Sequence, residues 1–597
     1  MNEERVTYFG QTDSRNKKVK FGIKAKDRTK HVYVIGKTGM GKSTLLENMA
    51  VQDIQNGEGM AFIDPHGKTA ELLLEYVPEH RMKDVVYFAP FDTDFPISFN
   101  VLESVDPGKR HLVVSGLMST FKKIWLDAWS ARMEYILTNT LLALLEYPEA
   151  TLLGVNRMLS DKEFRKQVIS YVTDPSVKAF WVQEFANYTE RMAAEAVPAI
   201  QNKIGQFTAN ALIRNMIGQP KSTFDLRKMM DEGKILIVNL SKGRIGESNA
   251  NLLGGMIITK IYLAALSRAD IPDRVLKTLP NFYLFVDEFQ SFANESFADI
   301  LSEARKYKLN LTIAHQYIEQ MEEEVRNAVF GNVGTMIIFR VGALDAEVLE
   351  KEFMPQFTAE DIVNLGIFQI YLKLMIDGIS SPPFSATTLP PIALPESSSM
   401  EKVIAESRRQ YACNKVDVEK KIDEWMAPIK APVKPKDPVQ IPVVPRPITP
   451  EPIVKAPIIH TPITRAPITH TPTVHAPIVH APVAPPFVAP VSVAQPRPVE
   501  QKPIPPVQRN DHVQNPIVHA QKPKTVSLSS LASIPKNNNQ KDANPQRVSE
   551  LKSALASILA SQPNPQKPPE KPPIAREKYE MKKEVPEDVL RNVLKVE

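Results

Sequence analysis

The sequence predicts an α/β protein built on a doubly wound, mostly parallel sheet, and three observations support this fold class. Short apolar runs rich in β-branched and aromatic residues alternate with helical segments over residues 1–108 and again over 233–395. Continuously apolar strands of this kind are typical of a parallel sheet covered by helices on both faces. A glycine-rich turn follows the first strong strand, and an acidic pair ends a later one.

The glycine-rich turn lies between a predicted strand at 31–35 and a predicted helix at 44–54. Residues 36–43, GKTGMGKS, match the G-x-x-x-x-G-K-[ST] spacing at every position. Glycines let the backbone curl so that successive N–H groups point at a phosphate, and the helix N-terminus faces the same anion. The sequence therefore predicts a nucleotide phosphate loop formed by Gly36, Lys37, Thr38, Gly39, Met40, Gly41, Lys42, Ser43 and Thr44.

Two side chains of this loop carry the expected chemistry. Lys42 is expected to reach the β- and γ-phosphates of a nucleotide, and the Ser43 hydroxyl is expected to ligate Mg²⁺. The next strand, 59–64, ends in an Asp-Pro-His-Gly turn at the edge where such folds gather ligands. His66 in this turn could be a ligand or a base, but a lone histidine there is more often structural, and we favour the structural interpretation.

The run FYLFVDEF at 282–289 places an acidic pair, Asp287 and Glu288, at the end of a predicted strand. A carboxylate in that place can hold Mg²⁺ beside the phosphate loop while a second one polarises the attacking water. The following strand, 309–315, leads to Gln316, which either senses the γ-phosphate or is an ordinary amide in a turn. Further strands are predicted at 234–240, at 335–341, which carries Arg340, and at 368–378, giving about seven strands.

Between residues 109 and 232 the strand signals vanish and apolar residues recur at helical spacing, which predicts an inserted all-helical lobe. One patch in this lobe interleaves aromatic and basic residues, namely Phe121, Lys122, Lys123, Trp125, Trp129, Arg132 and Tyr135. Such a patch could bind a nucleic-acid strand. The alternative, which we favour, is an amphipathic helix with its aromatic residues turned inward.

A short helical segment is expected at 396–427, and the composition changes abruptly after it: 34 of the 51 prolines lie in 428–597. Residues 456–480 repeat with a period of five. These features predict a disordered, extended tail, whose histidines are a poor metal site because no cysteine joins them. Two amphipathic stretches, 548–559 and 586–596, are predicted to become helical on a protein partner.

Charge and cysteine content narrow the class of protein further. The formal charge is −5 over residues 1–427 and +10 over 428–597, so nucleic-acid binding by the folded part needs a local patch or channel. The single cysteine, Cys413, excludes an intramolecular disulfide and fits a reducing compartment. The N-terminus lacks an apolar signal sequence, and no apolar run approaches the ~18 residues of a spanning helix. We therefore expect a cytoplasmic protein without a transmembrane segment of its own.

With these residues in place, the chain resembles the HerA/FtsK-type branch of P-loop ATPases, and within it the cytosolic parts of type IV secretion coupling proteins (the VirD4/TraG/TraD-like conjugative DNA-transfer ATPases). The motifs that carry the resemblance run in order over roughly residues 5–395 and are HVYVIGKTGMGKST, AFIDPHG, DVVYFAPFDTDFPISFNVLE, FYLFVDEFQSF, ARKYKLNLTIAHQ and FRVGALDAEVLEKEF. The resemblance implies a RecA-like core that binds ATP and Mg²⁺ and a homo-hexameric ring that moves DNA through its channel. Membrane-anchored coupling proteins begin with transmembrane helices, which are not seen here.

The resemblance also implies roles for individual residues. Ser43 and Asp287 would be metal-associated, with Lys42 and Thr44 on the nucleotide. Glu288 would activate water and Gln316 would sense the γ-phosphate. Two arginines would be candidates to act in trans on the ATP of a neighbouring subunit, namely Arg305, which we expect near the active edge of the sheet, and Arg340. For each arginine a surface ion pair is the alternative.

The leading hypothesis is a cytosolic ATP-driven DNA translocase that serves conjugation or secretion, either in the cytoplasm or at a membrane secretion complex, with protein partners recruited by the tail. A HerA-like repair motor working with a nuclease has the same chemistry and another partner. A nucleotide-dependent scaffold and a protein-moving ATPase are the alternatives from other classes. DNA-stimulated ATP hydrolysis separates the DNA motors from the last two.

Overall fold

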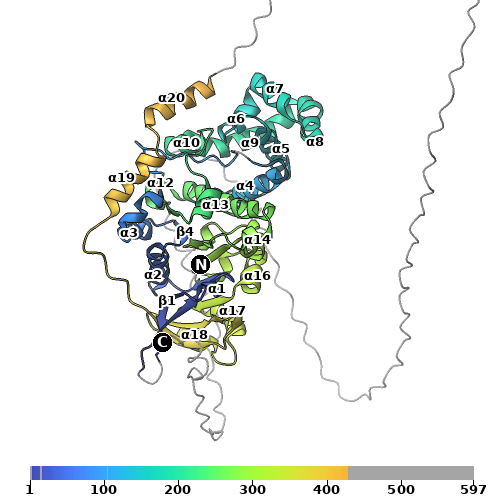
Figure 1. Ribbon diagram of the computed structural model, residues 1–597. Helices are drawn as coiled ribbons and strands as arrows, with labels where there is room; N and C mark the ends of the chain where they lie inside the picture. The colour runs from blue at the N-terminus through green and yellow to red at the C-terminus, as the bar shows by residue number, and fades with distance from the viewer. Residues whose placement is uncertain (1–2, 14–16, 104, 428–597) are drawn as a thin grey trace, which may run out of the picture. The chain divides into compact units, whose positions relative to one another are not determined.

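The computed structural model describes residues 3–13, 17–103 and 105–427 (Figure 1). All described residues belong to one compact unit. The predicted Pro-rich tail, its five-residue repeats and its two amphipathic stretches lie outside the described residues.

One sheet of eleven strands organises the described part of the chain. In sheet order the strands are β2 (Lys20–Lys24), β1 (Val6–Gln11), β13 (Phe384–Thr388), β10 (Gln369–Lys373), β9 (Thr335–Ile338), β3 (Val32–Ile35), β8 (Leu309–His315), β7 (Phe282–Val286), β4 (Gly59–Asp64), β6 (Ile235–Asn239) and β5 (Val85–Phe88). The strands from β9 to β5 pair in parallel, as predicted. A separate ribbon joins β11 (Met375–Ile376) to β12 (Ile379–Ser380).

The central strand β3 shows how the two faces of the sheet are covered. Successive residues of a strand point to opposite faces. Val32 and Val34 lie in one apolar cluster with side chains of α2 (Lys42–Gln55) and α3 (Lys68–Glu75). Tyr33 and Ile35 lie in the other cluster, with side chains of α13 (Glu247–Leu266), α15 (Ser296–Glu303) and α16 (Glu323–Asn332). Helices on both faces bury these strands completely, which explains their uninterrupted apolar sequences.

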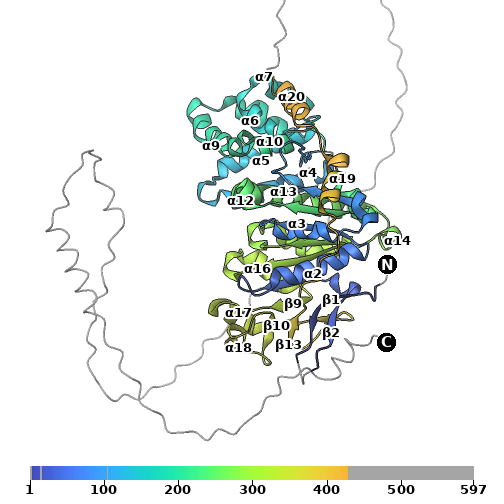
Figure 2. The same cartoon turned by 90° about the vertical axis from the view of Figure 1, so that its left-hand side faces the viewer.

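Four strands at one edge of the sheet pair antiparallel, which the sequence did not predict. β10 pairs antiparallel with β9 and β13, and β1 pairs antiparallel with β13 and β2. β1, β2 and β13 had not been predicted as strands. They bring the first residues of the described chain beside residues near 388, where Gly10 pairs with Thr388. Figure 2 shows this group at one end of the sheet, with helices α5 to α10 at the other end of the unit.

From residue 105 to residue 234 the described chain forms helices and turns and no strand, in agreement with the predicted helical insertion. Its helices are α4 (Arg110–Ile124), α5 (Ala131–Glu146), α6 (Leu153–Ser160), α7 (Lys162–Tyr171), α8 (Pro175–Ala179), α9 (Glu190–Ala209), α10 (Ala211–Ile217) and α11 (Leu226–Glu232). α4 packs closely on α13 (Glu247–Leu266), since a Cβ built on Gly255 would lie 2.7 Å from Thr120 Cγ2. Small residues at this contact therefore let α4 of the insertion pack closely on α13, a helix of the core.

Helix α13 is also the one described segment long and apolar enough to cross a membrane by length and composition, over Glu247–Asp270. Two thirds of its apolar window are buried inside the structure. It packs between α4 and the sheet, as the core helices of globular proteins do.

The remaining helices connect strands or extend the core. They are α1 (Ala25–Arg28), α12 (Lys242–Ile245), α14 (Asp273–Leu276), α15 (Ser296–Glu303), α16 (Glu323–Asn332), α17 (Ala343–Phe353), α18 (Ala359–Val363), α19 (Met400–Tyr411) and α20 (Lys415–Met426). α19 and α20 form the predicted helical segment at 396–427. The Ser407 hydroxyl of α19 accepts a hydrogen bond from the Tyr87 N–H of β5 at 2.9 Å, so α19 follows the edge strand.

Candidate nucleotide site

The phosphate loop connects the carboxyl end of β3 to the first turn of α2, in the middle of the sheet. Gly39 and Gly41 have φ values of 78° and 111°, in the left-handed region that glycine occupies without strain. The loop is tied to both neighbouring strands. The Gly36 N–H donates to the His315 carbonyl at 3.2 Å, and the Lys37 N–H donates to the Arg340 carbonyl at 2.8 Å.

Lys42 lies inside the curl of the loop, and only 6% of the residue is exposed. Its Nζ donates to the Gly36 carbonyl at 2.6 Å and to the Lys37 carbonyl at 3.2 Å. Burial lowers the pKa of Lys42, and the charges of Glu288 and Asp287 act in the opposite direction. Within the described residues Lys42 forms no ion pair. A buried ammonium held only by carbonyl groups of a phosphate-type loop fits the phosphates of a nucleotide.

The acidic pair follows β7, two strands away from β3 in the sheet. The Ser43 hydroxyl donates to Asp287 Oδ2 at 3.3 Å, so the first turn of α2 and the end of β7 meet. Burial and the neighbouring Glu288 and Asp64 carboxylates raise the pKa of Asp287 to about 6. A hydroxyl beside a buried carboxylate fits Mg²⁺, whose other ligands are usually water and substrate phosphates. Among the described residues no cluster of three or more His, Cys, Asp or Glu side chains offers a site made by protein groups alone.

Glu288 has a left-handed backbone, with φ of 48°, and its side chain turns toward the loop. Its carboxylate accepts hydrogen bonds from the side-chain amides of Gln316 and Gln290 and lies 3.5 Å from His66 Nε2. Burial raises the pKa of Glu288, but the hydrogen bonds from His66, Gln290 and Gln316 outweigh it and lower this pKa to about 2. Glu288 is therefore ionised at neutral pH.

Gln316 joins the acid to the phosphate loop. Its amide nitrogen donates to Glu288 Oε1, and its Oε1 accepts a hydrogen bond from the Thr38 hydroxyl at 3.0 Å. The sequence placed Gln316 at the end of the strand after the acidic pair, and β8 indeed lies between β7 and β3. Loop, amide and carboxylate thus form one continuous hydrogen-bonded chain.

His66 lies at this same edge, where the sequence predicts its turn; a role as ligand or base is the interpretation that we did not favour. The turn after β4 is held by Asp64, whose carboxylate accepts the His66 N–H at 2.8 Å and the Ala70 N–H at 2.9 Å. The imidazole is exposed and contacts Glu288, whose hydrogen bond is the main cause of the raised pKa of His66. The signal that could have found it is the sheet order, because β4 lies directly beside β7.

Arg305 is not near the phosphate loop of its own chain, and this part of our expectation was wrong. It lies in a 3₁₀ turn, Ala304–Tyr307, that precedes β8, so it stands at the amino ends of the parallel strands. The phosphate loop follows the carboxyl end of β3, a strand length of roughly 20 Å away. The charge of Arg305 helps to lower the pKa of His31, which precedes β3. Arg305 is exposed, and within the described residues it forms no ion pair.

Arg340 is placed differently. It follows β9, whose carboxyl end lies beside that of β3, and its carbonyl accepts the Lys37 N–H of the loop. The side chain is partly buried and forms no ion pair with any described residue. Arg340 therefore stands beside the phosphate loop of its own subunit.

The aromatic and basic patch of the helical insertion spans the end of α4, a 3₁₀ turn and the start of α5. Phe121 is buried and stacks on Trp125, with ring centroids 5.5 Å apart, and Trp125 contacts Phe207 at 5.3 Å. The Trp129 indole donates to Glu134 at 2.7 Å, and the Tyr135 hydroxyl donates to Glu184 at 3.0 Å. Phe121 is the buried ring of this patch, Trp125 and Trp129 are half-buried and Tyr135 is 47% exposed, so the inward orientation that we favoured holds at the end of α4 and not for Tyr135 on α5.

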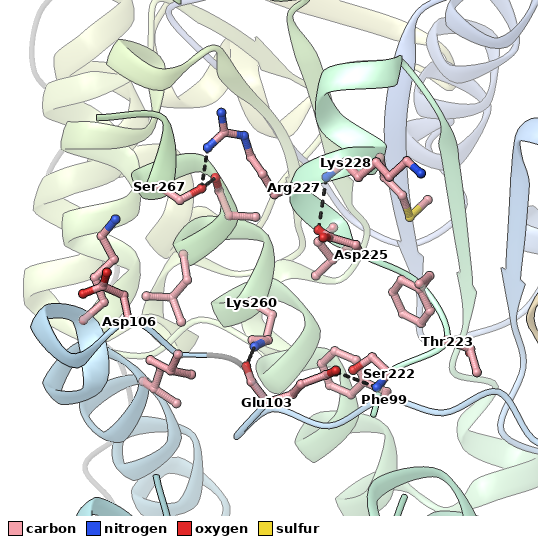
Figure 3. Close-up of a pocket in the computed structure, with 18 of the residues that line it drawn as sticks. Phe99, Glu103, Asp106, Ser222, Thr223, Asp225, Arg227, Lys228, Lys260 and Ser267 are labelled. Carbon is pink, nitrogen blue, oxygen red and sulfur yellow. Dashed lines mark hydrogen bonds between the residues drawn. The ribbon is translucent and has the colours of Figure 1, made fainter. Parts of the chain in front are cut away.

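A cavity of about 640 Å³ lies apart from the phosphate loop (Figure 3). None of its lining residues belongs to the loop or to the acidic pair. Lys260 of α13 reaches the Glu103 carbonyl at 3.2 Å on its wall, and Asp225 caps the first turn of α11 by accepting the Lys228 N–H at 3.1 Å. Lys109 pairs with Asp270 at its rim. These charged groups around the cavity are therefore engaged with backbone groups or with one another.

Comparison with known proteins gives the chain a family. A family model described as the type IV secretion-system coupling protein DNA-binding domain matches residues 18–354. No curated protein sequence matches the chain.

Three solved structures illustrate the similarity of the fold. The bacterial conjugative coupling protein TrwBdeltaN70 in its unbound form is 14% identical, with 66% of this chain and 96% of that chain covered and a TM-score of 0.49. Plasmid coupling protein TrwB with a non-hydrolysable ATP analogue is 14% identical, with 67% and 98% covered and a TM-score of 0.49. VirB4 of Thermoanaerobacter pseudethanolicus is 14% identical, with 61% and 90% covered and a TM-score of 0.40.

At such low identities and TM-scores the assignment rests on the family model, which spans more than half of the chain. The matched residues include the phosphate loop, the acidic pair and Gln316, which the structure brings together at one edge of the sheet. The chain belongs to the type IV secretion-system coupling protein DNA-binding domain family and is a coupling-protein-like P-loop NTPase.

Proposed function

We propose that this protein hydrolyses ATP to move DNA, as a motor of the type IV secretion coupling type. The observation that carries the proposal is the connected set of Lys42, Ser43 with Asp287, and Glu288 with Gln316 at the carboxyl edge of the sheet. The family description, a DNA-binding domain, supports DNA as the moving substrate.

Each residue of the set has a role that follows from its position. The loop N–H groups and Lys42 bind the β- and γ-phosphates, replacing the carbonyl contacts that Lys42 makes within the loop. Ser43 and Asp287 would hold Mg²⁺, which neutralises charge on the phosphates when it is bound. Because the pKa of Asp287 is raised to about 6, the carboxylate is ionised at neutral pH and becomes protonated as the pH falls below 6. The site therefore binds a cation better at neutral pH than at lower pH.

Glu288 accepts the proton of the attacking water. The water oxygen forms a bond to the γ-phosphorus, the bond from that phosphorus to the β–γ bridging oxygen breaks, and ADP and inorganic phosphate leave. Glu288 is ionised, but Gln316 and Gln290 occupy its oxygens in this structure. Gln316 must therefore turn from Glu288 and Thr38 toward the γ-phosphate. This movement couples nucleotide binding to release of the Glu288 carboxylate.

The arginine placement supports an assembly in which subunits share sites. Arg305 stands at the opposite edge of the sheet from its own loop, exposed and without an ion pair among the described residues. It is free to serve the ATP of a neighbouring subunit, where an arginine supplied in trans contributes ~10³–10⁵ in rate. Arg340 is better placed to act within its own subunit. We propose a homo-hexameric ring, with Arg305 as the residue that acts across each boundary.

The tail would recruit protein partners, and the motor would work in the cytoplasm, at a membrane secretion complex or on free DNA. A repair motor paired with a nuclease uses the same site and differs in its partner. A scaffold and a protein-moving ATPase use the same fold without DNA.

Measuring ATP hydrolysis by the full chain without DNA, with single-stranded DNA and with duplex DNA tests the proposal. We expect hydrolysis that needs Mg²⁺ and rises several-fold with one form of DNA. Hydrolysis that neither form of DNA changes would favour the scaffold or the protein-moving ATPase. The Lys42→Ala variant, which removes the phosphate-binding ammonium, is the control for contaminating ATPases.

A further inference from the structure

An exposed aromatic ring lies against the phosphate loop, and the phosphate-binding motif does not account for it. Phe368 stands in the turn before β10 and is 47% exposed. Its N–H donates to the Met40 carbonyl at 3.1 Å. A Cβ built on Gly41 would lie 2.7 Å from Phe368 Cδ1, so the ring touches the loop at the point where α2 begins.

The backbone of Phe368 adopts a conformation that phenylalanine disfavours. Its φ is 64°, in the left-handed region that bulky side chains avoid. A turn that needed only this conformation would be served by glycine or asparagine. The carbonyl of Phe368 is also fixed, because it accepts the Thr388 N–H of β13 at 2.9 Å. Strand β13 on one side and the phosphate loop on the other therefore hold this residue in place.

The ring of Phe368 is accessible to a ligand. Phe339, which also lies against Gly41, is buried. Phe368 instead presents about half of its surface to solvent, and its neighbour Ile367 is 57% exposed. An exposed apolar ring thus touches a loop built to hold charged phosphates, and the exposed Ile367 precedes it in the chain.

We infer that Phe368 is the platform on which the base of a bound nucleoside triphosphate stacks, with Ile367 beside it; the inference rests on the proposed nucleotide-binding function. The loop receives the phosphates, and the first turn of α2 receives the one that carries the sugar. The base lies one sugar beyond that phosphate, where an apolar surface next to the loop is needed. Aromatic rings bind bases through their faces and tolerate different bases, because every base has a π-face. Phe368 has no hydrogen-bonding group, so the platform accepts adenine and guanine alike.

The test separates the base from the phosphates by using a ligand that has no base. Calorimetric titration of the full chain with Mg²⁺ gives the Kd for ADP, for GDP and for inorganic tripolyphosphate. Phe368→Ala should raise the Kd for both nucleotides roughly tenfold, within the range of base–aromatic stacking, and leave the Kd for tripolyphosphate unchanged. Phe368→Trp should bind both nucleotides at least as tightly as the unaltered protein.

The matched control is Phe95→Ala, which removes a ring of the same size that is 42% exposed, in the loop after β5 at the far edge of the sheet. It should change none of the three affinities. An unchanged nucleotide affinity in Phe368→Ala, or an equal loss for nucleotides and tripolyphosphate, would overturn the inference, the latter because the ring would then only support the loop. If the unaltered protein binds neither nucleotides nor tripolyphosphate, the proposed function itself fails.

Discussion

The Thr38 hydroxyl of the phosphate loop donates a hydrogen bond of 3.0 Å to Gln316, 278 positions further along the chain. The other end of the Gln316 amide donates to Glu288. A single side chain thus connects the place where a γ-phosphate binds to the carboxylate that would activate water. In this arrangement the Glu288 carboxylate stays hydrogen-bonded to Gln316 until a γ-phosphate competes for the Gln316 amide.

Replacing Gln316 tests this connection. Gln316→Ala should bind ATP with an affinity close to that of the unaltered protein, because no loop N–H group and no Mg²⁺ ligand is changed. Its kcat should fall by roughly 10²-fold, the scale of losing one positioned hydrogen-bond donor to the transition state. Gln320→Ala, an exposed glutamine four residues later, is the control. A large rise in KM without a change in kcat would mean that Gln316 only shapes the loop.

Substitutions of Lys42 and Glu288 should distinguish nucleotide binding from ATP hydrolysis. Lys42→Ala should lose ATP turnover, because it removes the ammonium inside the loop. Glu288→Gln should keep ATP bound with Mg²⁺ and not hydrolyse it, since Asp287 and Ser43 remain in place. Equilibrium binding of labelled ATP, measured beside turnover, distinguishes the two variants. A Glu288→Gln protein that binds no nucleotide would show that the roles of the two carboxylates are wrongly assigned.

The in-trans arrangement predicts complementation between two inactive variants. Arg305→Ala should bind ATP normally and hydrolyse it poorly, whereas Lys306→Ala, whose lysine pairs with Glu303, should be unaffected. Mixing Arg305→Ala with Lys42→Ala subunits should restore part of the activity, because some boundaries then join an intact loop to an intact arginine. Light scattering with an ATP analogue should report an oligomer, with six subunits expected. Full activity in a strict monomer, or no rescue on mixing, would remove Arg305 from the mechanism.

His31 should make the stability of the folded part depend on pH. Its Nδ1 accepts the Leu311 N–H at 3.0 Å and its Nε2 donates to the Leu301 carbonyl at 3.2 Å, which requires the neutral ring. Burial lowers the pKa of His31 to about 4, partly opposed by the Leu301 hydrogen bond and assisted by Arg305. The unfolded chain takes up this proton near pH 6.5 and the folded chain only near pH 4, so the contribution is complete above pH 6.5 and is lost as the pH falls toward 4.

From the shift of this pKa, the loss between pH 6.5 and pH 4 should be about 3 kcal/mol. Urea unfolding at several pH values, compared with His31→Asn, measures it. Asparagine tolerates the left-handed backbone at this position, where φ is 62°. The variant should be less stable at pH 7 and flatter with pH, while the buried His315 and other titrating groups affect both proteins equally. Parallel pH profiles would contradict the assignment.

The parts of the fold that were predicted from the sequence are those with local signals. The strands of the parallel core are apolar along their whole length because both faces are covered, and the spacing of the phosphate loop is itself the motif. The edge strands β1 and β13 were missed because their pairing joins residues more than 370 positions apart and because β13, FSATT, is half polar. Nothing local in these sequences indicates a strand partner.

A side chain of the candidate site could be placed where neighbours in the chain are also neighbours in the sheet. Gln316 follows β8, which comes directly after β7 in the chain and pairs with it in parallel. His66 needed the knowledge that β4 pairs with β7, although more than 200 residues separate them. The edge assigned to Arg305 was wrong because the whole length of β8 separates that residue from Gln316. Phe368 was expected inside a strand, and its left-handed turn depends on contacts with Met40 and Thr388 that only the folded chain supplies.

The central claim is that this protein uses ATP to move along DNA. The most direct measurement is displacement of a third strand from a DNA triplex by the full chain, with ATP and Mg²⁺ present. The account predicts displacement that requires hydrolysable ATP and is lost in Glu288→Gln, which still binds the nucleotide. Hydrolysis of ATP by a protein that binds the triplex and leaves the third strand in place would contradict it.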